Sequence, residues 1–234
     1  MLKRIGLNWP LGIRVVIGAL LLAAGLAVGS CGDPRAGGDP PDGASSGLLP
    51  VGYALRLDRT NRAPADFVAT ADDGGLHVRT GPAGIVYRPD QVIDAPRYAL
   101  GARFTEIAAP VEHREGFGLF IGGQDLDGVN QRYLYFLVRG DGRYLIKQRN
   151  GASTREVSNG WQPSEAVQVA TMAEGDVTNE LAITVDGGRL HFACNGLLVA
   201  EMPVGDLTAQ GVVGVRVNHN LRVRIQEFRV APPS

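Results

Sequence analysis

The segment Tyr133–Arg149, with the sequence YLYFLVRGDGRYLIKQR, carries side chains that could bind a sugar. A three-residue loop at Gly140-Asp141-Gly142 would pair Phe136 with Ile146, gather the apolar residues on one face and place glycine at the left-handed loop position. Tyrosine rings can lie against sugar rings, while arginine and lysine donate hydrogen bonds to hydroxyl or carboxylate groups. The opposite face of the hairpin therefore predicts a ligand-binding surface, unless loops or neighbouring strands cover it. Its members are Tyr133, Tyr135, Arg143, Lys147 and Arg149.

A second group of polar residues lies just before this hairpin. Asp125, Asp127 and Asn130 bear side-chain oxygens at a spacing that suits calcium, but the run lacks the bidentate glutamate of an EF-hand loop. A polar turn between two strands explains the same residues. The four histidines are widely separated and include no closely spaced pair of metal ligands. We therefore expect no cofactor, with Ca²⁺ as the alternative.

Sequence patterns typical of catalysis are missing. Neither acidic cluster, EHREG at 112–116 or QDLDG at 124–128, shows the alternation that would set two carboxylates on one strand face for glycoside cleavage. The chain also has no nucleophile elbow, phosphate-binding loop or dinucleotide fingerprint. The sequence thus favours a non-catalytic protein, although missing motifs do not exclude an enzyme.

The N-terminus is typical of a targeting segment. A basic stretch ends at Arg14 and is followed by VVIGALLLAAGLA, which has the length of a signal-peptide core and is short for a membrane span. The next residues, Val28-Gly29-Ser30-Cys31, resemble the lipobox of bacterial lipoproteins. This resemblance implies cleavage after residue 30, lipidation of Cys31 and a location in the bacterial cell envelope, facing the periplasm or the exterior. A plain secretory signal and an uncleaved anchor helix are the alternatives.

Residues 31–66 then predict a lipidated cysteine followed by a flexible tether. The stretch GDPRAGGDPPDGASSGLLP is dense in Gly, Pro, Asp and Ser and has no apolar periodicity. Residues 51–66 could be either more linker or an extended lead-in to the domain. If Cys31 is lipidated, Cys194 has no partner for an internal disulfide. We expect Cys194 to be a buried free thiol rather than a reactive nucleophile.

Residues 67–231 predict an all-β domain. Short runs rich in aromatic and β-branched residues recur along the chain, with Gly, Pro or Asp between them. Asn195-Gly196 is a strong hairpin signal because both turn positions need a positive φ, and Asp186-Gly187-Gly188 marks another reversal. So many antiparallel strands must bury their apolar faces in a sandwich or a barrel.

The C-terminal part resembles concanavalin A-like (laminin G/glucanase) jelly rolls, which commonly close with an Asn-Gly hairpin, a glycine-rich strand and a final F-x-V strand. The matching residues are Asn195-Gly196, Gly211–Val215 and Phe228-Arg229-Val230. In style the domain is similar to bacterial domains of the 3-keto-disaccharide hydrolase type. The resemblance implies a two-sheet antiparallel sandwich in which one sheet is concave and often carries the ligand site.

Three functions remain open from the sequence. The first is non-catalytic binding of a glycan or related polymer by a membrane-tethered envelope lipoprotein. The second, implied by the resemblance, is a glycoside-cleaving enzyme, and the third is a structural or protein-interaction module. The formal net charge of −1 gives no support to nucleic-acid binding, and the sequence does not fix the oligomeric state.

Overall fold

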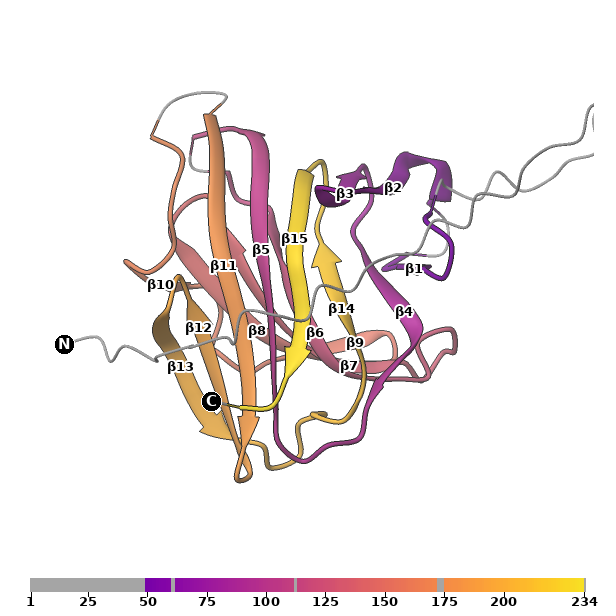
Figure 1. Ribbon diagram of the computed structural model, residues 1–234, viewed down its shortest axis with the longest axis vertical. Coiled ribbons are helices and arrows are strands. Elements are labelled where there is room, and N and C mark those ends of the chain that lie inside the picture. Colours follow the sequence, from indigo (N-terminus) through magenta and orange to yellow (C-terminus); the bar gives the residue numbers. More distant parts are fainter. Residues whose placement is uncertain (1–48, 60–61, 112, 172–174, 234) are drawn as a thin grey trace, which may run out of the picture.

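The computed structural model describes residues 49–59, 62–111, 113–171 and 175–233. The expected signal peptide, Cys31 and most of the expected tether lie outside these residues. Two antiparallel sheets pack face to face, and Figure 1 shows β11, β5 and β15 of one sheet in front of β6, β7 and β8 of the other. The prediction of an all-β, two-sheet jelly-roll sandwich is confirmed. Within the described residues, the helical structure includes nothing long and apolar enough to cross a membrane.

The eight-stranded sheet has the order β1-β4-β14-β6-β7-β8-β10, and β9 pairs with β8 outside this path. Its strands are β1 (Ala54–Leu57), β4 (Gly84–Ile93), β14 (Gly211–Val217), β6 (Gly116–Gln124), β7 (Arg132–Arg139), β8 (Arg143–Asn150), β9 (Ser153–Glu156) and β10 (Gln162–Pro163). The seven-stranded sheet has the order β13-β12-β11-β5-β15-β3-β2. Its strands are β13 (Leu197–Pro203), β12 (Arg189–Cys194), β11 (Gly175–Asp186), β5 (Tyr98–Ala109), β15 (Arg222–Ala231), β3 (Gly75–Thr80) and β2 (Phe67–Asp72). A short 3₁₀ turn, η1 (Pro64–Asp66), precedes β2.

Both predicted reversals of the C-terminal meander are present. Asn195 and Gly196 join β12 to β13 with φ values of 51° and 75°, as a primed two-residue turn requires. Gly187 and Gly188 join β11 to β12, also at positive φ. Glycine and asparagine tolerate this region because a bulkier side chain there would crowd the backbone. The turn residues therefore fix where these strands reverse.

The main core lies between the two sheets. Alternate residues of each strand point inward, and Phe136 of β7 meets Phe192 of β12 with ring centroids 5.4 Å apart. Phe104 of β5 and Phe117 of β6 make a similar contact at 5.7 Å. These four side chains are at most 1% exposed. Full burial of each phenylalanine side chain stabilises the folded state by roughly 1.5–3 kcal/mol. These aromatic contacts therefore contribute much of the free energy that holds the two sheets together.

The chain joins the sandwich before residue 67. Residues 51–66 are ambiguous in the sequence, and the structure shows part of them as an extended lead-in. β1 is the edge strand of the eight-stranded sheet, where Ala54 pairs with Tyr87 and Leu57 with Gly84. Leu57 is buried in the main core, which gives this strand an apolar anchor.

Candidate functional site

The β7–β8 hairpin has the predicted register. Phe136 pairs with Ile146 and Val138 with Tyr144, and Gly142 has a φ of 78° in the three-residue loop. One face of the hairpin belongs to the main core. The five predicted ligand-binding residues all lie on the other face, because they occupy the alternate positions of the two strands. The hairpin therefore brings together the side chains that the sequence analysis selected.

The exposure of these residues differs from the expectation. Tyr133 and Tyr135 are only 1% and 4% exposed, and Arg149 is 8% exposed. Arg143 and Lys147 reach the surface, with side chains 42% and 22% exposed. The outer face of this sheet thus has two levels. Tyr133, Tyr135 and Arg149 lie beneath, and Arg143 and Lys147 lie at the rim.

The buried level is a second apolar cluster outside the sandwich, here called the outer aromatic layer. Its buried members are Ile85, Tyr87, Phe120, Leu126, Tyr133, Tyr135 and Leu137. Neighbouring rings contact one another in a row across β4, β6 and β7, with centroid distances of 5.3–6.2 Å. The loop that follows β6 covers one end, since Leu126 packs into the layer and Asp127 accepts a hydrogen bond from the Tyr87 hydroxyl at 2.8 Å. This covering explains why the tyrosines are not exposed.

Three charged side chains, here called the Asp58 triad, are embedded beside this layer. Arg216 of β14 donates hydrogen bonds to both carboxylate oxygens of Asp58, at 2.8 and 2.6 Å, and Arg149 of β8 lies 3.0 Å from the same carboxylate. Arg216 also donates to the Tyr133 hydroxyl at 3.2 Å, and its guanidinium lies 4.8 Å from the centre of the Tyr135 ring. Both tyrosines therefore contact Arg216 from the layer beneath it.

The electrostatics of the triad favour its charged form. Burial alone would raise the pKa of Asp58, but hydrogen bonds and charge from Arg216 and Arg149 outweigh it and hold the pKa below its ordinary value. Burial raises the pKa of Tyr135 to about 12, so its hydroxyl stays neutral. Two guanidiniums share one carboxylate, which leaves an excess positive charge at this point of the face. The Nε atoms of Arg149 and Arg216 are buried and have no hydrogen-bond acceptor among the described residues.

A second charged group lies at the hairpin turn. Arg139 forms an ion pair with Asp141 at 2.6 Å and stacks on Trp161 at 4.3 Å from its ring centre. Arg143 lies 3.7 Å from the same carboxylate and donates to the Trp161 carbonyl at 3.1 Å. Trp161 rests directly on β6, because a Cβ at Gly116 would lie 2.7 Å from the indole ring. The glycine leaves room for this half-buried aromatic ring against the strand.

Lys147 completes the rim between these two groups. Its ammonium lies 3.1 Å from Glu156 of β9, whose side chain is 50% exposed. β9 is a short strand with every residue exposed, and its pairing with β8 sets Glu156 opposite Lys147. The rim therefore offers both donors and acceptors to a polar ligand.

Sequence reasoning missed Asp58 and Arg216. Asp58 follows β1, far from the hairpin in the chain, and nothing in its local pattern indicates a partner. The sequence hinted at a role for Arg216, since it is the one charged residue among the valines of β14 and occupies a position that points away from the main core. Their meeting depends on the strand order β1-β4-β14-β6-β7-β8, which no local sequence pattern reveals.

The loop with Asp125, Asp127 and Asn130 is explained by its own hydrogen bonds. A carboxylate oxygen of Asp125 accepts a hydrogen bond from the backbone N–H of Asn130 at 3.1 Å, and Asp127 accepts one from the Tyr87 hydroxyl. Within the described part of the chain, no three His, Cys, Asp or Glu side chains are grouped to hold a metal ion. The polar-turn interpretation therefore accounts for these residues.

Cys194 is a buried free thiol, as predicted. Its Sγ contacts the Ala166 carbonyl at 3.4 Å and the Asn179 side-chain oxygen at 3.5 Å. Burial, with a smaller effect from Glu180, raises the pKa of this thiol to about 12. A thiol held neutral at this depth is a packing group rather than a nucleophile.

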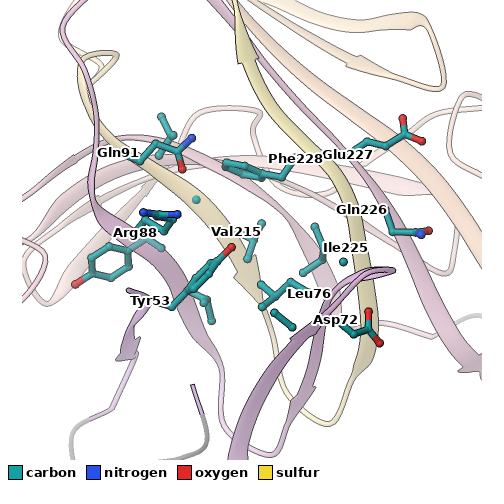
Figure 2. Close-up of a pocket in the computed structure, with 16 residues that line it drawn as sticks. Tyr53, Asp72, Leu76, Arg88, Gln91, Val215, Ile225, Gln226, Glu227 and Phe228 are labelled. Atoms are coloured by element: carbon teal, nitrogen blue, oxygen red, sulfur yellow. The ribbon is translucent and has the colours of Figure 1, made fainter. Parts of the chain in front are cut away.

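A separate cleft of about 150 Å³ opens between the edges of the two sheets. Figure 2 shows its apolar interior, which includes Val215, Leu76 and Ile225, with Tyr53 and Arg88 at its mouth. The register of β15 shifts between Gln226 and Arg229 beside the cleft. The cleft is smaller than the roughly 300–1,000 Å³ typical of small-molecule sites.

Comparisons with known proteins agree with the architecture. No family model matches the chain, and no curated protein matches its sequence. The carbohydrate-binding module CBM66 from Bacillus subtilis is similar in structure, with a TM-score of 0.53 and 10% identity over 76% of this chain and 94% of the module.

Two further solved structures are similar with lower scores. A Bacillus subtilis protein of unknown function with a galectin-like fold has a TM-score of 0.49 and 14% identity, over 77% of this chain and 89% of that one. The carbohydrate recognition domain of Emp47p has a TM-score of 0.47 and 11% identity, over 82% and 93% of the two chains. The similarity to the CBM66 module shows the fold, which is a jelly-roll sandwich of the concanavalin A-like class.

Proposed function

We propose that this protein is a membrane-tethered envelope lipoprotein whose sandwich binds a glycan or related polymer without catalysis. The binding surface is the outer face of the eight-stranded sheet. The observation that carries this proposal is the Asp58 triad, because two arginines are buried around one partly exposed carboxylate on a face that lies outside the main core. Transferring charged side chains from water into a buried site costs free energy, and well-packed apolar residues in their place are often equally stable or more stable. Perturbed charged groups set among aromatic rings are typical of functional sites.

The two levels of the face have different roles in this proposal. Arg143, Lys147 and Trp161 contact the ligand at the rim, through hydrogen bonds and ring stacking. Tyr133 and Tyr135 act from beneath by holding Arg216 in place. Because Asp141 and Glu156 already fix the rim cations, little side-chain freedom is lost on binding.

The fold similarity supports the proposal in a limited way. The CBM66 structure is that of a carbohydrate-binding module, so a sandwich of this kind can serve such a role. The assignment to this chain rests on the outer face itself.

The binding experiment uses the full chain and a panel of immobilised polysaccharides. We expect saturable retention on at least one member and no released product. The double variant Arg143→Ala/Lys147→Ala should bind at least tenfold more weakly. The matched control is Arg222→Ala, because Arg222 is an exposed cation on β15 of the other sheet.

Three results would count against the proposal. Full binding by the double variant would place the site elsewhere. Release of product would favour the glycoside-cleaving alternative. A lack of retention by every glycan, with retention of an envelope protein, would favour the interaction-module alternative.

The tether is tested separately in bacterial cells fed a labelled fatty acid. The lipobox-like Val28-Gly29-Ser30-Cys31 predicts that the wild-type chain incorporates the label and that Cys31→Ala does not. The variant Cys194→Ala is the control and should keep the label. Equal labelling of wild type and Cys31→Ala would exclude the lipoprotein assignment.

A further inference from the structure

The outer face carries more positive than negative side chains. Among the described side chains whose ion pairs and hydrogen bonds build this face, six are cations and four are carboxylates, an excess of two positive charges on a chain whose formal net charge is −1. The cations are Arg56, Arg139, Arg143, Lys147, Arg149 and Arg216, and the carboxylates are Asp58, Asp127, Asp141 and Glu156. The excess is local to this face and runs against the balance of the whole chain.

The excess is concentrated at two places. Asp58 is shared by Arg149 and Arg216, at 3.0 and 2.6 Å. Asp141 is shared by Arg139 and Arg143, at 2.6 and 3.7 Å. Each place thus has two guanidiniums for one carboxylate. Lys147 lies between them and is matched by Glu156, so it adds no net charge.

The spacing of the two places suits an extended ligand. Arg143 and Arg149 lie on the same face of β8, six residues apart. At the rise of a β-strand this separates their Cα atoms by about 20 Å. A single sugar cannot span that distance, whereas a polymer lying along β8 can contact both places.

We infer that the ligand is a glycan chain whose sugars bear carboxylates, that is, a uronic-acid polymer. This inference rests on the proposed function and names the ligand class of the same surface. One carboxylate of the polymer accepts a hydrogen bond from Nη2 of Arg143, while the adjoining sugar ring lies on Trp161. A second carboxylate, further along the chain, is attracted by the net positive charge of the Asp58 triad without touching its buried guanidiniums.

The chemistry of arginine supports this ligand class. The planar guanidinium matches a carboxylate with two parallel hydrogen bonds, and the pair is stronger than a neutral one. The Arg143 side chain is 42% exposed, with Nε 3.7 Å from Asp141 and Nη1 donating to the Trp161 carbonyl, so Nη2 is the nitrogen left to face a ligand. A neutral polysaccharide would leave the excess charge at both places without a partner.

The test measures the affinity of the full chain for four polymers at an ionic strength of about 0.15 M, where interactions between distant exposed charges are screened. The probes are polygalacturonate, its methyl ester, dextran sulfate and a neutral glucan. The methyl ester keeps the sugar backbone and removes the charge. We expect polygalacturonate to bind at least tenfold more tightly than each of the other three.

Variants locate the contact. Arg143→Gln and Arg149→Gln should each weaken polygalacturonate binding at least fivefold and should weaken binding of the methyl ester by a smaller factor. Arg222→Gln is the control with the same loss of charge on the other sheet. Because Arg149 is buried, its variant is first checked for a native unfolding transition, and exposed Arg143 serves as the test that does not depend on folding.

Each result decides the question. Equal affinity for polygalacturonate and its ester, or binding of the neutral glucan alone, would overturn the uronate inference and leave glycan binding intact. Dextran sulfate bound as tightly as polygalacturonate would also overturn it, since the face would then respond to charge alone. Failure to bind any of the four, together with failure on the wider polysaccharide panel, would refute the proposed function as well.

Discussion

Arg216 donates two hydrogen bonds to the carboxylate of Asp58, across 158 positions of the chain. The pair ties the segment after β1 to the strand next to β6, over the outer aromatic layer. Arg216 is almost completely buried, whereas the Asp58 side chain is 24% exposed. The carboxylate is therefore the point at which this buried charge network meets the solvent.

Replacing Asp58 by asparagine should destabilise the fold. The variant leaves Arg149 and Arg216 without a counter-charge, and removing one partner of a buried ion pair typically costs about 3–5 kcal/mol. Because Asp58 is partly exposed, we expect about 2–4 kcal/mol in urea unfolding. The control is Asp90→Asn, whose fully exposed pair with Arg88 should contribute nothing measurable.

The same variant predicts a pH dependence. The pKa of Asp58 is lower in the folded state than in the unfolded state. The stabilisation by the ionised Asp58 is therefore complete above its unfolded-state pKa of about 3.9, and it is lost as the pH falls through its folded-state pKa. The gap in unfolding free energy between wild type and Asp58→Asn should therefore shrink as the pH falls below 4. A gap that stays constant between pH 7 and pH 3 would contradict this account.

The hairpin shows how far local sequence can reach. Alternation of apolar residues and the Gly140-Asp141-Gly142 loop were enough to predict that Phe136 pairs with Ile146. The pairing register can be predicted from the hairpin alone, because a shift of one residue would turn every side chain to the wrong face of the sheet. The same holds for Asn195-Gly196, whose two positive φ values follow from the residue types.

The burial of Tyr133 could not be predicted in the same way. It depends on Phe120 of β6, on Leu126 of the loop and on Arg216 of β14, all outside the hairpin. A tyrosine on an outer strand position looks the same in the sequence whether it faces water or a second apolar layer. The strand order, rather than any strand alone, decides its exposure.

Gly142 predicts a backbone effect that depends on residue type. Its φ of 78° lies in the left-handed region, and a Cβ there would meet Val169 only at 3.4 Å, which is an ordinary contact. The cost of substitution is therefore conformational. We expect Gly142→Val to lower the unfolding free energy by about 1–2 kcal/mol and Gly142→Asn by about half as much, since asparagine tolerates this region. Equal losses in urea unfolding would show that packing dominates instead.

Cys194 should resist alkylation in the folded protein. Burial raises its pKa to about 12, so almost no thiolate is present at pH 8. Peptide mapping after iodoacetamide treatment should show no adduct on Cys194 under native conditions and a complete adduct in denaturant. Ser153→Cys supplies the control, because residue 153 is exposed on β9 and should label quickly without denaturant. Rapid native labelling of Cys194 would reveal local opening of β12.

Glu106 predicts a pH dependence of the opposite sign. Its carboxylate is buried on β5 and lies 2.5 Å from Nδ1 of His113. Burial raises the pKa of Glu106, and the hydrogen bond and charge of His113 offset this only in part. The folded state therefore binds a proton more tightly than the unfolded state does. Any stability that this proton contributes is complete below the unfolded-state pKa of about 4.3, and it is lost as the pH rises through the folded-state pKa.

Glu106→Gln isolates this effect, because glutamine keeps the shape and an oxygen that can accept a hydrogen bond from His113 but does not ionise. The unfolding free energy of the variant minus that of wild type should increase between pH 4 and neutral pH, whatever its value at pH 4. Asp58→Asn provides the contrast, since its own difference becomes more negative as the pH rises toward 4 and is constant above that. A difference for Glu106→Gln that is flat with pH would mean that His113 compensates the buried carboxylate completely. Of these two carboxyl groups, Asp58 alone would then contribute to the pH dependence of folding.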